Sequence, residues 1–196
     1  MNRTLRNLAC SLTILLLCTT LSGCTFFDRI QLKKDAQTYV KMKSVMNMAI
    51  EEYYAMLDRS KSEVALDFKD ESEDSDHNYF LNLLDQAISI GSEIKSEEFR
   101  NVVLEYRKTA KALTYAYTYY GIFCSGIYDY QFDKSIIYDQ SFQMVYADSY
   151  SNFQNYDVVF NEKYTKAQEE EDKLNSMGLF EDVEWPDDNG DYADED

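Results

Sequence analysis

The chain of 196 residues is strongly acidic: 36 Asp and Glu outnumber 19 Lys and Arg, which gives a formal net charge of −17. Phosphate binding requires clustered basic side chains, so this balance argues against nucleic acid as a partner. The single histidine, His77, leaves few ways to build a histidine-based metal site or catalytic triad. We therefore expect no cofactor, no metal and no catalytic residues.

The first 24 residues read as a secretory leader. Arg3 and Arg6 form a positive start, and an apolar run from Leu8 to Leu21 is too short for a membrane-spanning helix but suits a signal peptide. The run ends in Leu21-Ser22-Gly23-Cys24, which resembles the lipobox of bacterial lipoproteins. The alternative is an ordinary secretory leader in which this tetrapeptide occurs by chance.

The lipobox resemblance implies that residues 1–23 are removed and that Cys24 is acylated with palmitate-type chains. Two or three such chains anchor a protein stably in a membrane. Thr25 follows the cysteine, and in lipoproteins of this kind a non-acidic residue there implies sorting to the outer membrane, if the cell has two membranes. The expected location is the cell envelope, in the outer membrane or periplasm, with the domain held close to the membrane.

The charge of the expected mature chain is unevenly distributed. Loss of Arg3 and Arg6 leaves 17 basic residues against 36 acidic ones, a net charge of −19. Between Thr25 and Ile50, two acidic residues are outnumbered by five basic ones: Arg29, Lys33, Lys34, Lys41 and Lys43. This basic collar would suit anionic lipid headgroups beside an anchor, or it is an ordinary solvated helix face.

Helical spacing appears early and resumes after a charged interruption. From Asp28 to about Ser60, apolar residues recur at steps of three and four: Tyr39, Met42, Met46, Ala49, Tyr53 and Met56. Residues 61–77 alternate charges and serines, which predicts an exposed loop or acidic hinge with His77 in solvent. A second helix is then predicted from the spacing of Phe80, Leu84, Ala87, Gly91 and Ile94.

The most regular pattern follows. Seven steps alternate four and three without a fault along Phe99, Val103, Tyr106, Ala110, Leu113, Tyr117, Tyr120 and Cys124. This is typical of antiparallel bundle packing. Gly121 and Gly126 predict a turn, followed by a short strand at residues 128–132. A hairpin across residues 124–126 is the rival interpretation, although an isolated hairpin is marginal in water.

The last helix is predicted from about residue 134 to residue 177, with one apolar side formed by Tyr138, Phe142, Val145, Ser149, Tyr156, Phe160, Ala167 and Leu174. Gly178 followed by Leu179 predicts a left-handed C-cap. Residues 180–196 carry nine acidic residues and no basic one, which predicts a disordered tail whose start Trp185 could pin to the bundle.

Tyrosines are concentrated in one region: 12 of the 17 lie between Tyr106 and Tyr164, and the segment Ala112–Tyr128 has no charge. It is too polar for a membrane span. Three interpretations stay open: a buried bundle end, an exposed patch for a protein partner, or a sugar-stacking groove. The candidate partner or ligand surface consists of Tyr115, Tyr117, Tyr119, Tyr120, Tyr128 and Tyr130.

Together these patterns predict an all-α fold, an elongated antiparallel bundle of three or four long helices over residues 24–179. The expected function is that of a non-enzymatic envelope lipoprotein that binds another protein, with an assembly, inhibitor or immunity-type role and with a basic partner as one option. The alternative is a lipoprotein that binds a glycan or small molecule through the tyrosine cluster.

Overall fold

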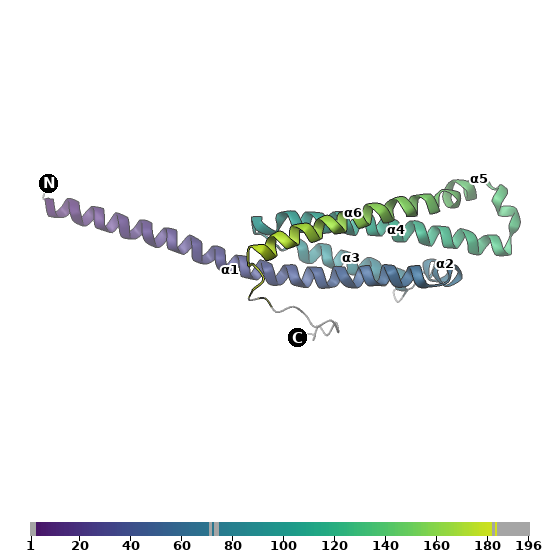
Figure 1. Ribbon diagram of the computed structural model, residues 1–196, viewed down its shortest axis with the longest axis horizontal. Helices are drawn as coiled ribbons and strands as arrows, with labels where there is room; N and C mark the ends of the chain where they lie inside the picture. The colour runs from purple at the N-terminus through teal and green to yellow at the C-terminus, as the bar shows by residue number, and fades with distance from the viewer. Residues whose placement is uncertain (1–2, 71, 73–74, 182, 184–196) are drawn as a thin grey trace.

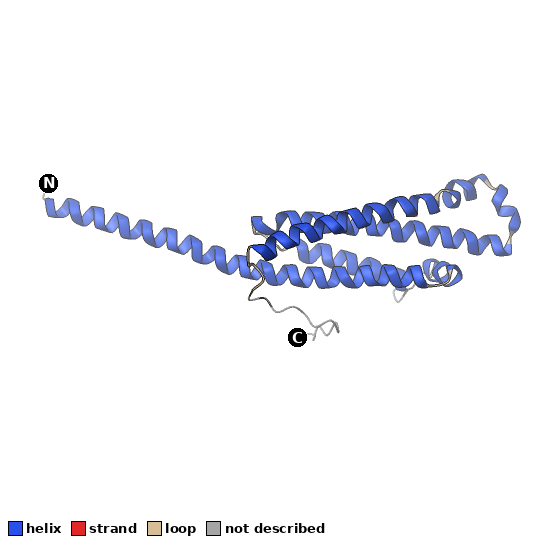
Figure 2. Ribbon diagram, in the orientation of Figure 1, coloured by secondary structure: helices blue, strands red, loops and turns tan. Residues whose placement is uncertain are grey.

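The described part of the molecule is helical. The computed structural model describes residues 3–70, 72, 75–181 and 183, and these ranges contain no strand (Figure 2). The same ranges contain short 3-10 turns at Glu97–Phe99 and Lys134–Tyr138 and a π turn at Gln143–Ala147. Their α-helices are α1 Arg3–Asp58, α2 Lys61–Lys69, α3 Asp76–Ser92, α4 Arg100–Phe132, α5 Gln140–Phe142 and α6 Ser149–Ser176.

The four long helices form an elongated antiparallel bundle, which confirms the predicted fold class (Figure 1). α1 packs along α3, α4 packs along α6, and the short α2 lies against α4. We call the end at which α1 enters the bundle the proximal end and the opposite end the distal end. The proximal end carries the link between α3 and α4 and the C-terminal end of α6 (Figure 1). The distal end carries α2 and the connection from α4 to α6, which protrudes beyond α2 (Figure 1).

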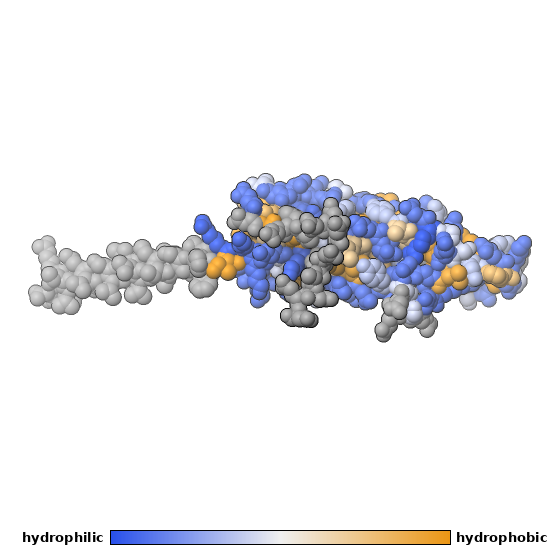
Figure 3. All heavy atoms as spheres, turned by 90° about the horizontal axis from the view of Figure 1, so that it is seen from below, coloured by the Kyte–Doolittle hydropathy of each residue, from blue (hydrophilic) through white to orange (hydrophobic). Residues whose placement is uncertain are grey.

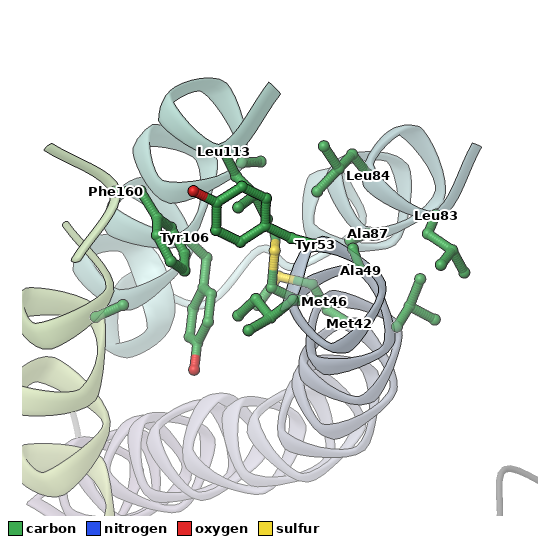
Figure 4. Packing of buried hydrophobic residues seen from close by; sticks show 14 of the residues in the cluster. Met42, Met46, Ala49, Tyr53, Leu83, Leu84, Ala87, Tyr106, Leu113 and Phe160 are labelled. Carbon is green, nitrogen blue, oxygen red and sulfur yellow. The ribbon is translucent and has the colours of Figure 1, made fainter. Parts of the chain in front are cut away.

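The two seams predicted from sequence spacing form the core (Figure 4). The six seam residues of α1 are each at most 2% exposed, and the eight from Phe99 to Cys124 are each at most 9% exposed. Aromatic contacts join the helices across this core. The Tyr53 ring of α1 meets the Phe160 ring of α6 edge-on, with 5.6 Å between centroids.

The loop predicted over residues 61–77 is wrong at residues 61–69, which form α2, and at residues 76–77, which begin α3. A capping box begins α2: the Ser60 hydroxyl accepts from the Glu63 amide, and the Glu63 carboxylate accepts from the Ser60 amide. Val64 and Ala65 of α2 are buried. This largely charged segment therefore contains a short apolar face.

The predicted turn at Gly121 and Gly126 is also wrong, as are the strand after it and the rival hairpin, since α4 continues to Phe132. Each glycine instead marks a place where another element approaches α4 closely. A Cβ at Gly121 would lie 2.2 Å from the ring of Phe68 in α2, and one at Gly126 would lie 2.8 Å from the ring of Tyr146. Close packing requires the missing side chains, despite the cost of about 0.5–1 kcal/mol for glycine in a helix.

The last predicted helix forms only from Ser149 onward. Asp133 accepts hydrogen bonds from the amide and hydroxyl of Ser135, and Asp139 accepts from the amides of Ser141 and Phe142. Aspartates that bond nearby amides start new turns, so the chain breaks into short pieces between α4 and α6.

The predicted apolar side of this helix is correct at four positions of α6 and wrong at Val145, whereas the side chain of Tyr138 lies outside the described residues. Val145, which precedes α6, is 51% exposed, and Tyr156 is only half-buried. The residues that are buried as predicted are Ser149, Phe160, Ala167 and Leu174.

α6 ends in the C-cap predicted from Gly178. Gly178 has a φ of 70°, its amide donates to the Asn175 carbonyl, and the Leu179 amide donates to the Leu174 carbonyl. These two bonds define a Schellman motif.

The packed domain continues beyond the predicted boundary at residue 179. The Phe180 ring lies 5.4 Å from that of Tyr39 and 5.9 Å from that of Phe99, and Val183 is buried. The prediction of disorder from residue 180 is therefore wrong at these two positions, and a chain cut after Leu179 would lose the Phe180 contact. Residues 184–196, with Trp185, lie outside the described residues.

α1 extends from within the predicted leader through residue 24 into the bundle, and no loop interrupts it (Figure 1). The side chain of Cys24 lies outside the described part of the chain, so leader removal and acylation stay predictions. Among the residues that the structure describes, none of the helices combines the length and the apolar character needed to cross a membrane.

Candidate functional site

The six tyrosines predicted to share a surface do not form one. Tyr117 and Tyr120 lie in the core, at 1% and 9% exposure. The other four are partly or well exposed and lie at two places along α4: Tyr115 and Tyr119 in the middle, Tyr128 and Tyr130 near the distal end. The uncharged segment is thus part core and part surface, according to which side of α4 each residue occupies.

Tyr117 belongs to an enclosed aromatic stack with the only histidine. Its ring stacks on Phe80 at 3.9 Å between centroids and lies 5.5 Å from the ring of His77. His77 also meets Phe68 edge-on at 4.7 Å, so the predicted solvent exposure is wrong and the side chain is half-buried. Burial lowers the pKa of His77, although the charge of Asp67 opposes this shift. The histidine packs α2 against α4.

Cys124 is buried and unreactive. Burial raises the pKa of its thiol to about 11. The thiolate is the nucleophilic form of cysteine, so burial disfavours nucleophilic chemistry at this side chain. Burial likewise raises the pKa of the adjacent Tyr120 to about 12, and the Tyr120 ring packs on Phe153 of α6 at 4.8 Å.

A charged cluster joins three helices inside the bundle. Glu171 of α6 is 5% exposed, and its Oε1 pairs with Lys43 Nζ of α1 at 2.5 Å. The Tyr106 hydroxyl of α4 donates to the other carboxylate oxygen at 3.5 Å. Burial, together with the negative charge of Glu171, raises the pKa of Tyr106. Both oxygens of this carboxylate have partners, so the cluster ties helices together and offers no free base.

Asp35 is a second buried carboxylate with a structural task. At 1% exposure, it accepts hydrogen bonds from the amides of Lys95 and Ser96, from the Ser96 hydroxyl and from the Gln31 side chain. Burial opposes ionisation, but these hydrogen bonds outweigh it and lower the pKa of Asp35. The carboxylate fastens the link between α3 and α4 to α1.

Two open hollows on the described surface have no tyrosine in their lining. One open hollow follows α6 and is lined by Val158, Asn161, Glu162, Thr165, Lys166 and Glu169. Another follows α1 and is lined by Arg29, Ile30, Lys33, Lys34 and Gln37. Within the described ranges, His, Cys, Asp and Glu side chains do not gather in threes to hold a metal ion.

Tyr115 and Tyr119 form a small outward cluster with α6. The Tyr156 ring lies 4.8 Å from that of Tyr115 and is stacked on that of Tyr119 at 5.6 Å. Tyr115 is 39% exposed, and the other two are half-buried. This cluster joins α4 to α6 through ring contacts.

Several large apolar side chains are exposed at the distal end, where the space-filling view shows hydrophobic residues on the surface (Figure 3). Phe132 is 75% exposed, at the last position of α4. We call four exposed residues of this end the distal apolar set: Tyr130, Phe132, Val145 and Tyr150.

Packed neighbours support the distal apolar set. The Tyr128 ring lies 5.0 Å from that of Phe132, and Lys69 Nζ of α2 lies 5.2 Å from the centroid of the Tyr128 ring. Lys69 also pairs with Asp129, so α2 holds this part of α4 in place. The Tyr150 ring packs on Phe123 at 4.7 Å. The exposed rings of Phe132 and Tyr150 are thus each supported by a packed aromatic neighbour.

The distal end is negatively charged as well as apolar. Residues 128–150 contain four aspartates and one lysine. The hydroxyl and amide of Ser135 lower the pKa of Asp133, and amides of Phe142 and Ser141 lower that of Asp139. These two carboxylates therefore stay ionised at neutral pH.

Sequence reasoning located part of this end and missed the rest. Tyr130 is among the candidate residues, but the sequence predicts Phe132 in a strand and Val145 on the buried side of a helix. The signal that identifies the break is the pair Asp133 and Asp139, each followed two residues later by serine, which marks successive turn starts.

Fold and surface together define a helical-bundle protein with an acidic distal end that exposes apolar rings. No protein-family model, curated protein or solved structure matches the chain.

Proposed function

We propose that the chain is a lipid-anchored lipoprotein of the bacterial cell envelope, held in the outer membrane where there are two membranes, that acts without catalysis by binding another protein. The observation that carries the binding role is the exposure of the distal apolar set, above all Phe132 at 75%. Aromatic side chains give large contact area at low entropic cost and dominate interface energetics.

The position of the distal apolar set relative to the proposed anchor supports this role. α1 enters the bundle from residue 24 without a loop, and the distal end lies at the opposite end of the elongated molecule (Figure 1). The helix from residue 24 to residue 58 is about 50 Å long at 1.5 Å per residue. A protein anchored at Cys24 would present the apolar rings well away from the bilayer surface.

The charge of the distal end specifies the chemistry of the partner. Four aspartates lie in the same stretch of sequence, residues 128–150, as the distal apolar set, so a complementary surface would combine an apolar centre with lysines or arginines at its rim. An assembly, inhibitor or immunity-type role fits such a contact. The alternative is a glycan or small-molecule site, which would need a concave pocket lined by tyrosines.

Position-specific photocrosslinking in intact cells tests the proposal. A photoreactive amino acid at position 132 or 145 should give one discrete adduct with an envelope protein, because both side chains project into solvent at the distal end. Position 104 in α4 is the matched control, since Leu104 is 46% exposed but lies outside the distal apolar set.

Excess unlabelled wild-type protein should suppress the adduct, and excess Phe132→Ser/Val145→Ser protein should not. An equal adduct from position 104, or no adduct from either distal position, would reject the distal end as the binding surface.

A further inference from the structure

One side of α1 carries an exposed cationic stripe near the proximal end. Residues spaced by three and four lie on the same side of a helix, and the exposed positions with this spacing are Arg29, Ile30, Lys33, Lys34, Gln37 and Lys41. The stripe is about 18 Å long at 1.5 Å per residue. Asp28 is the exposed acidic residue beside its start.

In this part of α1 the basic side chains of the stripe are exposed, whereas the acidic side chain of Asp35 is buried. Asp35 turns inward, where its carboxylate accepts four hydrogen bonds, so it does not neutralise the stripe. Within the part of the chain that the structure describes, the four cations of the stripe form no ion pair with any carboxylate. The stripe therefore presents four positive charges on a molecule whose net charge is −17.

The described chain ends beside this same helix. After α6, Phe180 packs its ring 5.4 Å from that of Tyr39, which lies within the span of the stripe along α1. Val183 is buried, and its amide donates to the Phe180 carbonyl at 3.2 Å. These contacts tether the chain to α1 immediately before residue 184.

Residues 184–196 have the charge and length to reach the stripe. They contain seven acidic residues and no basic one. Tyr39 and the stripe occupy different sides of α1, so the segment must pass around a helix roughly 10 Å across. Thirteen residues span up to roughly 40 Å, which is ample for that path and for the full stripe.

We propose that residues 184–196 dock on the cationic stripe of α1 in the same molecule. A tether this short gives an effective concentration on the order of millimolar, which favours intramolecular pairing over contact with a second copy. The pairs lie at the surface, so salt screens them on a scale of about 10 Å at 0.1 M. The docked segment would compete with anionic lipid headgroups for the same lysines.

Trp185 gives a selective readout, because it is the only tryptophan in the chain. In the full chain, purified in non-ionic detergent, we expect high Trp185 fluorescence anisotropy at about 0.02 M salt and a fall on raising salt to about 0.5 M. Lys33→Glu/Lys34→Glu should lower the anisotropy at low salt to the high-salt value.

The matched control, Lys61→Glu/Lys111→Glu, changes the net charge equally at exposed positions off the stripe and should behave as the wild type.

Zero-length carbodiimide crosslinking with peptide mass spectrometry identifies the docking site directly. Links from residues 184–196 should form within monomers and should favour Lys33, Lys34 and Lys41 over Lys61 and Lys111 by several-fold. Links spread evenly over all lysines, links confined to dimers, or a salt-independent Trp185 anisotropy would overturn the proposal. None of these readouts depends on the acyl anchor or on the distal binding partner.

Discussion

Replacing Leu113 by aspartate should destabilise the bundle by about 3–5 kcal/mol, enough to unfold a typical domain of this size in part. Leu113 is fully buried at the centre of the α4 seam, among other buried residues of the core (Figure 4). An aspartate there would lose its hydration and find no counter-charge in the seam. Urea unfolding followed by far-UV circular dichroism measures the loss.

The same helix supplies the control for this prediction. Leu104→Asp makes the identical chemical change at a position that is 46% exposed, so stability should change by no more than about 0.5 kcal/mol. If the two variants unfold at the same urea concentration, α4 does not face the core in the orientation described.

Replacing Lys43 by methionine should have the next largest effect, about 2–4 kcal/mol, since it leaves the carboxylate of Glu171 without its ion-pair partner. Glu171 is 5% exposed, and the remaining hydrogen bond from Tyr106 is long, at 3.5 Å. The double variant Lys43→Met/Glu171→Leu should recover much of the loss, because no buried charge is then left unpaired.

An exposed pair in α6 controls for the general loss of a lysine. Lys173 pairs with Glu170 at the surface, and Lys173→Met should cost at most about 1 kcal/mol. A loss for Lys43→Met no greater than for Lys173→Met, or a double variant weaker than Lys43→Met alone, would show that Glu171 is hydrated in solution.

The two seams could be predicted because the period of an α-helix appears directly in the spacing of apolar residues along the sequence. The apolar positions of α1 and α4 recur every three or four residues, and burial follows that pattern from Tyr39 to Met56 and from Phe99 to Cys124. The C-cap at Gly178 was predictable for a similar reason, since glycine followed by an apolar residue carries the Schellman signature locally.

The incorrect predictions concern residue types that can have either of two structural roles. Gly121 and Gly126 were interpreted as turn residues, whereas they admit the Phe68 and Tyr146 rings against α4. Only the tertiary arrangement reveals which rings approach. The sequence pattern does not predict α2 because this segment is rich in charged residues. Ser60 and Glu63 nevertheless have the spacing of a capping box before Val64.

Only part of the candidate tyrosine surface could be predicted from the sequence. The concentration of tyrosine correctly drew attention to α4, but which rings are buried depends on neighbours that sequence spacing does not specify. Tyr117 is covered by Phe80 of α3, whereas Tyr130 lies beyond the reach of the α1 and α3 pair and is 38% exposed. Phe132 and Val145 are exposed because the chain breaks into turns after α4.

A lipid anchor at Cys24 is the central claim of the proposed function, and metabolic labelling tests it most directly. Cells given an alkyne-tagged fatty acid should label the wild-type protein, and mass spectrometry of its first peptide should show a chain that begins at Cys24 and carries acyl groups. Cys24→Ser should take up no label. An unlabelled wild-type protein, or a mature chain that begins at another residue, would contradict the anchor.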